Sequence, residues 1–140
     1  EALLLYPVHL NPNVQKPVRE MLGGVDNVVL CDPVGYPAFV AMMQVADVII
    51  TDSGGVQEEA PALGKPVLVT RDITERPEAV AAGAVDLVGP HGDALCAKAG
   101  EYLRNPPRRP PISPYGDGKA AGRCVDAILG LDLEEFSPPA

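Results

Sequence analysis

The sequence predicts an α/β protein with a doubly wound parallel sheet, because short apolar runs alternate with helix-like segments over most of its 140 residues. The apolar runs have the length of buried strands, the segments between them favour helix, and the connections are short. Together these observations favour parallel strands with helices on both faces of the sheet. The expected strands are Leu3–Val8, Asn27–Cys31, Asp47–Thr51, Val67–Thr70 and Asp86–Val88.

Apolar residues at helical spacing predict the first two helices. After the first strand these residues are Val14, Val18, Met21 and Leu22. After the second strand they are Phe39, Met42, Met43 and Ala46. The later helices are bounded by proline and glycine: one runs from the third strand to Leu63, before Gly64, and another runs from Pro77 to Gly83. Two more are expected at 93–104 and 118–130.

We expect a main domain over residues 1–104, a Pro/Gly-rich linker at 105–117, a C-terminal helix at 118–130 and a tail at 131–140. The linker contains Asn-Pro-Pro-Arg-Arg-Pro-Pro-Ile-Ser-Pro, a composition typical of extended chain. The sequence shows no internal repeat.

The composition excludes several classes of function. A net charge of −8 argues against a nucleic-acid surface, which needs clustered lysine and arginine. No apolar run approaches the ~18–20 residues of a membrane span, and the first residues lack the basic region of a signal peptide. Cys31, Cys96 and Cys124 have no metal-ligand spacing, so reduced thiols and a cytoplasmic location are expected. The usual nucleotide-binding motifs G-x-x-x-x-G-K-[ST] and G-x-G-x-x-G after the first strand are absent, as is the hydrolase motif G-x-S-x-G.

Polar ligands bind parallel sheets beyond the carboxyl ends of the strands. The residues at these positions are His9, Asn11, Asp32 to Tyr36, Asp52 to Gly55, Arg71 to Arg76 and Gly89 to His91. The turn Ser53-Gly54-Gly55 is the most informative, because it joins a strand to a helix and leaves helix N–H groups open to an anion. An ordinary capped helix explains the same residues equally well.

Each charged residue near this turn likewise has a ligand-binding interpretation and a structural one. Glu58 or Glu59 could accept hydrogen bonds from the two hydroxyls of a ribose, or the two could form a solvated pair near a helix start. Arg71 or Arg76 could offer charge to a diphosphate, or either could be a surface arginine. His9 could contact a ligand, although a structural role is more common for a lone histidine.

Five motifs occur in order and at fitting spacing. They are 6–14 (Tyr-Pro-Val-His-Leu-Asn-Pro-Asn-Val), 51–59 (Thr-Asp-Ser-Gly-Gly-Val-Gln-Glu-Glu), 64–67 (Gly-Lys-Pro-Val), 74–78 (Thr-Glu-Arg-Pro-Glu) and 114–120 (Pro-Tyr-Gly-Asp-Gly-Lys-Ala). With them the chain closely resembles the C-terminal half of the non-hydrolysing UDP-N-acetylglucosamine 2-epimerases. The resemblance implies a Rossmann-like UDP-binding domain of a two-domain GT-B fold. It also implies interconversion of UDP-N-acetylglucosamine and UDP-N-acetylmannosamine through elimination and re-addition of UDP.

The resemblance also implies roles for individual residues, without a metal or cofactor. Ser53, Gly54 and Gly55 would bind the phosphates of the UDP-sugar. Glu59 would hold the ribose hydroxyls, Arg76 would lie near the diphosphate, and Phe39 would lie at the uracil. His9 matches a position associated in bacterial members with a second, regulatory UDP-N-acetylglucosamine molecule.

The family's acid/base carboxylates belong to an N-terminal domain that this sequence lacks, as it lacks the strand that normally opens the C-terminal domain. We therefore expect no catalytic residue and no turnover in this chain alone. We also expect the strands at 3–8 and 47–51 to lack the partner between them. The missing N-terminal half, another chain or a second copy are the expected partners. The alternatives are the nucleotide-sugar-binding half of a GT-B glycosyltransferase and an inert fragment.

Overall fold

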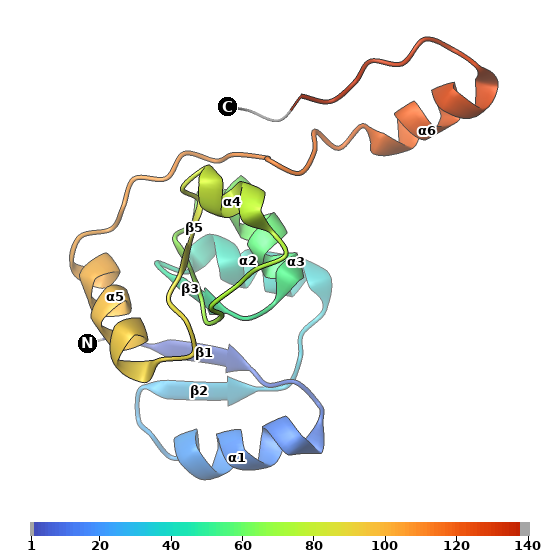
Figure 1. Ribbon diagram of the computed structural model, residues 1–140. Coiled ribbons are helices and arrows are strands. Elements are labelled where there is room, and N and C mark those ends of the chain that lie inside the picture. The colour runs from blue at the N-terminus through green and yellow to red at the C-terminus, as the bar shows by residue number, and fades with distance from the viewer. Residues whose placement is uncertain (1, 138–140) are drawn as a thin grey trace. The chain divides into compact units, whose positions relative to one another are not determined.

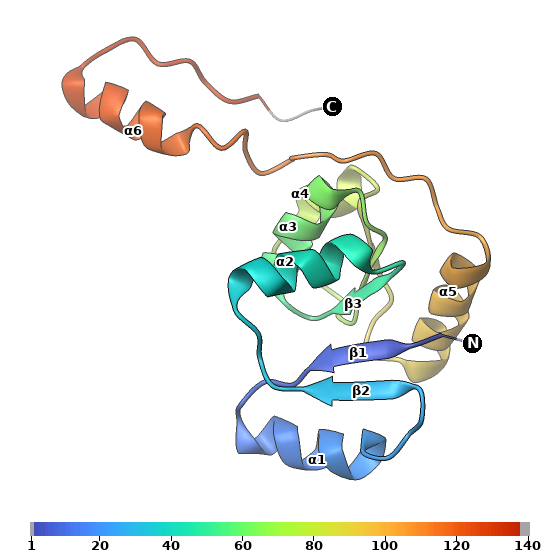
Figure 2. The same cartoon turned by 180° about the vertical axis from the view of Figure 1, so that it is seen from behind.

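The computed structural model describes residues 2–137, and the chain divides between residues 42 and 43 into two compact units. The first unit contains β1 (Leu4–Pro7), α1 (Pro12–Leu22) and β2 (Val28–Cys31). The two strands pair in parallel, with Leu4 opposite Val28 and Pro7 opposite Cys31. Helix α1 connects them and lies alongside β2 (Figure 1 and Figure 2). Helix α2 (Tyr36–Val45) leads from this unit into the second.

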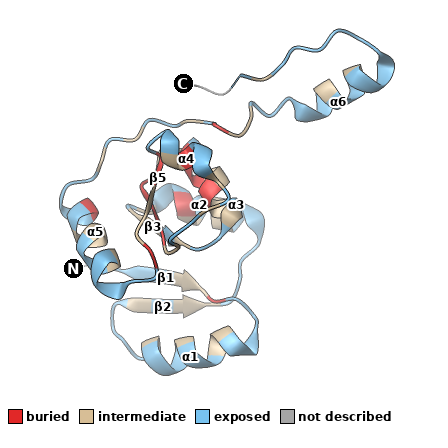
Figure 3. Ribbon diagram, viewed as in Figure 1, coloured by how far each residue is buried: buried red, intermediate tan, exposed pale blue. Residues whose placement is uncertain are grey.

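The second unit is built on a three-stranded parallel sheet in the order β3-β4-β5. Its elements are β3 (Ile49–Thr51), α3 (Gly54–Glu59), the 3-10 helix η1 (Ala60–Leu63), β4 (Val67–Val69), α4 (Pro77–Ala81), β5 (Val85–Leu87), α5 (Gly92–Arg104) and α6 (Ala120–Leu129). All three residues of the central strand β4 are 0% exposed. The buried residues therefore gather around this sheet and α4, whereas α6 has no buried residue (Figure 3).

The predicted α/β class, the five parallel strands and the order of the helices are confirmed. One helix differs from the prediction. The helix expected to run from the third strand to Leu63 is α-helical only as far as Glu59 and continues as η1. Pro61 explains the change, because proline has no N–H to donate to the carbonyl oxygen of Gln57.

The parallel ladders form two separate sheets. Among residues 2–137, β1 pairs with β2 alone and β3 pairs with β4 alone. Each of these strands therefore has one edge with no strand beside it, as predicted from the sequence for the strands at 3–8 and 47–51.

The proline-rich segment 105–113, called the strap below, has no regular secondary structure but is anchored to the second unit. Arg109 donates to Asp86 Oδ2 at 2.5 Å and to the Tyr102 hydroxyl at 2.8 Å. Tyr102 also donates to Asp86, and burial raises the pKa of Tyr102. Farther along the strap, the N–H of Ile112 donates to the carbonyl oxygen of Pro61 at 3.0 Å. The strap is thus fixed to both β5 and η1.

Two further observations concern the described residues only. Cys31, Cys96 and Cys124 are all free thiols. No helix within residues 2–137 is long and apolar enough to cross a membrane.

Candidate functional site

The turn between β3 and α3 presents the start of a helix at the carboxyl end of a strand. Ser53 occupies the N-cap position in an extended conformation (φ −78°, ψ 129°), and its N–H donates to Thr51 Oγ1 at 3.0 Å. Its hydroxyl makes no capping hydrogen bond, unlike the hydroxyl of a usual serine N-cap. Gly54 and Gly55 form the first turn of α3, where helix N–H groups lack intrahelical acceptors. The turn therefore offers backbone donors that a phosphate can accept.

Arg76 lies beside this turn, at the N-cap of α4. A Cβ atom placed on Gly54 would lie 3.9 Å from Arg76 Nη2, so the guanidinium is next to the helix start. Arg76 Nε donates to Glu58 Oε1, and Nη1 donates to the carbonyl oxygen of Glu75 at 3.1 Å. Hydrogen bonding to Glu58 raises the pKa of the Arg76 guanidinium, which keeps its positive charge. The side chains of Arg76 and Glu58 are 36% and 38% exposed, so solvent and ligands can reach them.

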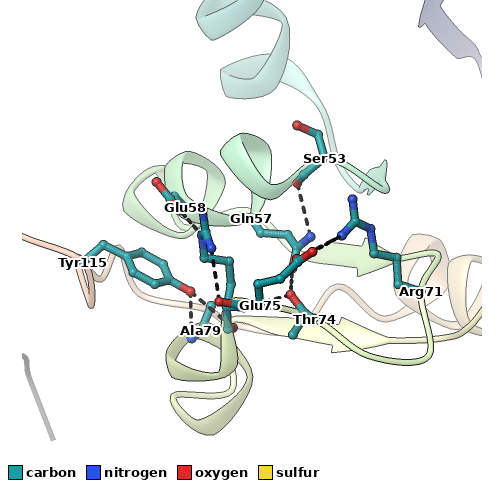
Figure 4. A network of polar contacts seen from close by, with 9 residues as sticks. Ser53, Gln57, Glu58, Arg71, Thr74, Glu75, Ala79 and Tyr115 are labelled. Atoms are coloured by element: carbon teal, nitrogen blue, oxygen red, sulfur yellow. Dashed lines mark hydrogen bonds and ion pairs between the residues drawn. The ribbon is translucent and has the colours of Figure 1, made fainter.

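The backbone of Arg76 is held on both sides. Its N–H donates to Thr74 Oγ1 at 3.1 Å, and its carbonyl oxygen accepts from the Tyr115 hydroxyl at 3.3 Å. The same hydroxyl accepts from the N–H of Ala79 at 3.1 Å, and burial raises the pKa of Tyr115. Figure 4 shows Thr74, Ala79 and Tyr115, which take part in these hydrogen bonds, around the loop that enters α4.

A second connection joins the helix start to the loop before α4. Gln57, in α3, is 0% exposed. Its Nε2 donates to the carbonyl oxygen of Ser53 at 3.3 Å, and its Oε1 accepts from Thr74 Oγ1 at 2.5 Å (Figure 4). Nearby, Arg71 donates to both carboxylate oxygens of Glu75 at 3.0 and 2.9 Å. A backbone hydrogen bond at Glu75 and the charge of Arg71 lower the pKa of this carboxylate.

The structure brings four of the predicted site residues together: Ser53, Gly54, Gly55 and Arg76. Arg71 makes its ion pair with Glu75. Of the two glutamates, Glu58 holds Arg76, while Glu59 is the last residue of α3 and is partly buried.

Phe39 and His9 belong to the first unit. Phe39 is partly buried in α2, where its N–H donates to the carbonyl oxygen of Gly35. His9 is exposed, and its Nδ1 accepts from the N–H of Asn11 at 3.1 Å. In this arrangement Nε2 is the nitrogen that carries the proton of a neutral His9 ring.

Sequence reasoning missed Gln57, included Thr74 only within the candidate range 71–76 without giving it a role, and assigned Tyr115 only to the loop that starts the last helix. Gln57, Ala60 and Pro61 are all buried, and their spacing marks one helix face. A polar residue on that face was the signal that could have identified Gln57. No comparable local signal exists for Tyr115, whose partners are distant in sequence.

Within residues 2–137, no three or more histidine, cysteine, aspartate or glutamate side chains are placed to hold a metal ion. A cavity of about 430 Å³ is lined by α6 and the segment after it, including Arg123, Cys124 and Phe136. None of the residues lining it was predicted as a site residue. Glu134 and Glu135 are among its lining residues, and carboxylates repel a diphosphate, so we place the candidate site at the β3–α3 turn instead.

Comparison with known proteins identifies relatives of the chain. The family model described as UDP-N-acetylglucosamine 2-epimerase matches residues 1–129. A probable UDP-N-acetylglucosamine 2-epimerase of Ralstonia nicotianae is 54% identical over 129 residues, which cover 89% of this chain and 34% of the relative. The UDP-N-acetylglucosamine 2-epimerase of Escherichia coli K12 is 52% identical over the same length. The chain thus spans about a third of the length of these relatives.

Solved structures give the same result. The UDP-GlcNAc 2-epimerase of Neisseria meningitidis bound to UDP-GlcNAc matches with a TM-score of 0.86 and 45% identity, covering 91% of this chain and 36% of that one. Staphylococcus aureus MnaA in complex with UDP matches with a TM-score of 0.85 and 36% identity, covering 99% and 40%. The predicted fold, the C-terminal part of a GT-B-type protein, is confirmed by these matches.

Proposed function

Because the chain belongs to the UDP-N-acetylglucosamine 2-epimerase family, we propose that it binds the uridine diphosphate part of a UDP-sugar at the β3–α3 turn. The observation that supports this most directly is the position of Arg76 Nη2, 3.9 Å from a Cβ atom placed on Gly54. A fixed positive charge and open helix N–H groups then face the same point. The proposal assigns phosphate binding to Ser53, Gly54, Gly55 and Arg76.

The remaining ligand contacts belong to the same proposal. Glu59 accepts hydrogen bonds from the ribose hydroxyls, and Phe39 contacts the uracil. His9 contacts a second, regulatory UDP-N-acetylglucosamine molecule. Solved relatives from Neisseria meningitidis and Staphylococcus aureus, which carry UDP-GlcNAc and UDP, support a nucleotide-sugar ligand of this kind.

The proposed reaction explains why a phosphate site matters for catalysis. A base removes the proton from C2 of the sugar, the C1–O bond to UDP breaks, and a C1–C2 double bond forms. Returning the proton to the opposite face of C2 and UDP to C1 gives the epimer. Negative charge develops on the departing diphosphate, and the N–H groups of Gly54 and Gly55 together with Arg76 stabilise it. These residues therefore stabilise the leaving group and also position the ligand.

The acid/base carboxylates of this reaction are proposed to lie in the part of the relatives that this chain does not cover. On this proposal, the 140 residues alone bind UDP but do not turn over UDP-N-acetylglucosamine. The active protein then needs a complementary N-terminal part, in the same chain or another, and a homodimer and a cytoplasmic location are part of the same hypothesis. Steady conversion of UDP-N-acetylglucosamine by the chain alone would contradict the predicted inactivity.

Calorimetry with UDP tests the binding proposal directly. The wild-type chain should bind UDP, and Arg76→Met should weaken binding about tenfold to a hundredfold, since a hydrogen bond to a charged group contributes about 1.5–3 kcal/mol. The matched control is Arg104→Met, the same change at an exposed residue of α5. No binding by the folded wild-type chain, or equal loss in both variants, would overturn the proposal.

A further inference from the structure

Gln57 is a buried polar residue to which neither the motifs nor the proposed ligand contacts assign a role. It is 0% exposed and lies in α3, between the residues proposed to bind phosphate and those proposed to bind ribose. A buried amide is costly unless both its donor and its acceptor are satisfied, so the partners of Gln57 show what it does.

The donor side of Gln57 fixes the orientation of one peptide plane. The carbonyl oxygen of Ser53 accepts from Gln57 Nε2 at 3.3 Å and also from the backbone N–H of Gln57 at 3.2 Å. The N–H of Gly54 belongs to the same planar peptide unit and points opposite to this carbonyl oxygen. The two hydrogen bonds that hold the carbonyl therefore also aim the Gly54 N–H out of the N-terminal end of α3.

The acceptor side of Gln57 connects the same plane to Arg76. Thr74 Oγ1 donates to Gln57 Oε1 at 2.5 Å, and Thr74 Oγ1 also accepts from the N–H of Arg76 at 3.1 Å. An unbroken series of hydrogen bonds thus runs from the Ser53 carbonyl to the Arg76 backbone. The Glu58 carboxylate separately holds the Arg76 side chain, so the backbone and the guanidinium are fixed independently.

We propose that Gln57 is a positioning residue that, through Thr74, sets the distance and angle between the Gly54 N–H and Arg76 so that both reach one diphosphate. This inference rests on the proposed UDP site. It goes beyond that site because Gln57 and Thr74 need not touch the ligand. Their effect should appear in the part of the affinity that depends on the second phosphate, where the Gly54 amide and Arg76 must act together.

The chemistry of the two side chains specifies the informative variants. Glutamine at 57 must donate and accept, so Gln57→Met removes both bonds at similar length, and Gln57→Glu loses the donor to Ser53. Threonine at 74 must also donate and accept, so Thr74→Val removes both bonds at almost constant shape, whereas Thr74→Ser keeps them. Variants at positions 57 and 74 thus break the same series of hydrogen bonds at two different residues, and Thr74→Ser is the conservative variant that should keep it intact.

The measurement is the ratio of the dissociation constants of UMP and UDP, determined by calorimetry beside urea denaturation of each variant. Gln57→Met and Thr74→Val should each weaken UDP binding about tenfold and UMP binding much less, while Thr74→Ser keeps the wild-type ratio. The double variant should lose little more than either single variant, because each breaks the same series of bonds.

Val85→Ala is the stability control, because Val85 is 1% exposed in β5 and its side chain makes no polar contact. It should lower stability and leave the UMP-to-UDP ratio unchanged. A wild-type chain that binds UDP, with an unchanged ratio in folded Gln57→Met and Thr74→Val, would overturn this inference alone. The same change in the UMP-to-UDP ratio of dissociation constants in Val85→Ala would also overturn it, because the effect would then come from general destabilisation. A folded wild-type chain that binds no UDP would overturn the proposed function and this inference with it.

Discussion

A Cβ atom placed on Gly64 would lie 2.8 Å from the carbonyl oxygen of Arg109 and 3.2 Å from Cδ of Pro111. The strap thus crosses the end of η1 so closely that only a hydrogen atom fits at Gly64. This glycine also has a left-handed backbone, with φ of 65°. Space and backbone conformation therefore both require glycine at this position.

Gly64→Ala should accordingly destabilise the protein more than the same change at Gly83. Gly83 has the same φ of 65°, but a Cβ atom there would meet nothing within 4 Å. Gly83→Ala should cost about 1–2 kcal/mol, the usual penalty of a left-handed alanine, and Gly64→Ala should cost clearly more because the strap must move. Urea denaturation of the two variants measures the difference. Equal losses of unfolding free energy in the two variants would show that the strap moves aside without an energetic penalty, which would contradict this prediction.

Arg109 should anchor the strap through its charge. Its side chain is 12% exposed and pairs with Asp86, whose side chain is 34% exposed. Arg109→Met should lower the free energy of unfolding by about 2 kcal/mol, less than for a fully buried pair because water still reaches Asp86. The neighbouring exposed Arg108→Met is the matched control and should change stability by less than about 0.5 kcal/mol. A similar loss in both variants would mean that the ion pair is not the anchor.

Glu59→Ala should weaken UDP binding, since this carboxylate is proposed to accept hydrogen bonds from both ribose hydroxyls. The expected loss is about 1.5–3 kcal/mol. Comparing UDP with 2′-deoxy-UDP isolates the contact: the wild-type chain should prefer UDP, and Glu59→Ala should bind the two ligands almost equally. Glu58→Gln serves as the control and should keep the preference, because Glu58 holds Arg76 instead. Preservation of the preference in folded Glu59→Ala would refute the assignment.

Tyr115→Phe should loosen the Arg76 loop in a pH-dependent way. Burial raises the pKa of Tyr115 above its ordinary value of 10.0, so the folded protein keeps this proton at a pH where the unfolded chain has lost it. Stability should therefore fall as the pH rises above about 10, and this fall should be smaller in Tyr115→Phe. At about pH 8 the variant reports only the lost hydrogen bonds to Arg76 and Ala79, about 1 kcal/mol. Thermal unfolding midpoints across this pH range provide the measurement, and parallel profiles would contradict the expectation.

Asp117 should make the last helix sensitive to acid. Arg123 donates to both carboxylate oxygens of Asp117 at 2.7 Å, and with the N–H of Lys119 it lowers the pKa of Asp117 well below its ordinary 3.8. Because the pKa of Asp117 is lower in the folded state, the ionised carboxylate stabilises the start of α6 fully at pH values above its ordinary pKa of 3.8. This stabilisation is lost as the pH falls below 3.8 towards the lowered pKa. Asp117→Asn should remove it already at neutral pH. Amide NMR signals of α6 should then show fraying that does not change with acid, and wild-type-like signals in the variant would contradict this.

The sequence predicted the strands and helices because their signals are local. Apolar runs and helical spacing lie within about ten residues, and Pro77 and Gly64 mark helix ends directly. The rule that polar ligands bind beyond strand ends likewise placed Ser53, Gly54 and the segment 71–76 among the candidates. The choice of Arg76 over Arg71 came from the family resemblance. Whether Glu58 or Glu59 meets Arg76 could not be decided in this way, because it depends on how α3 is rotated around its axis.

The contacts of Tyr115, Gln57 and Arg109 were beyond sequence reasoning for a related physical reason. Each joins segments that are distant in the chain, and hydrogen bonds of this kind leave no periodic pattern. The strap shows the limit well: its prolines predicted extended chain, but only the structure shows that Arg109 and Ile112 fasten it to β5 and η1.

Within the described part of its sheet, β4 is the strand flanked on both sides, while β3 has one open side. Backbone amides on an edge strand exchange their hydrogens with solvent first, whereas the amides of β4 should exchange only when the whole unit unfolds. Deuterium uptake should consequently advance from β3 towards β4. The loop bearing Ser53 is therefore attached to an edge strand of the sheet, and an anion bound there should slow isotope exchange along β3 far more than along β4.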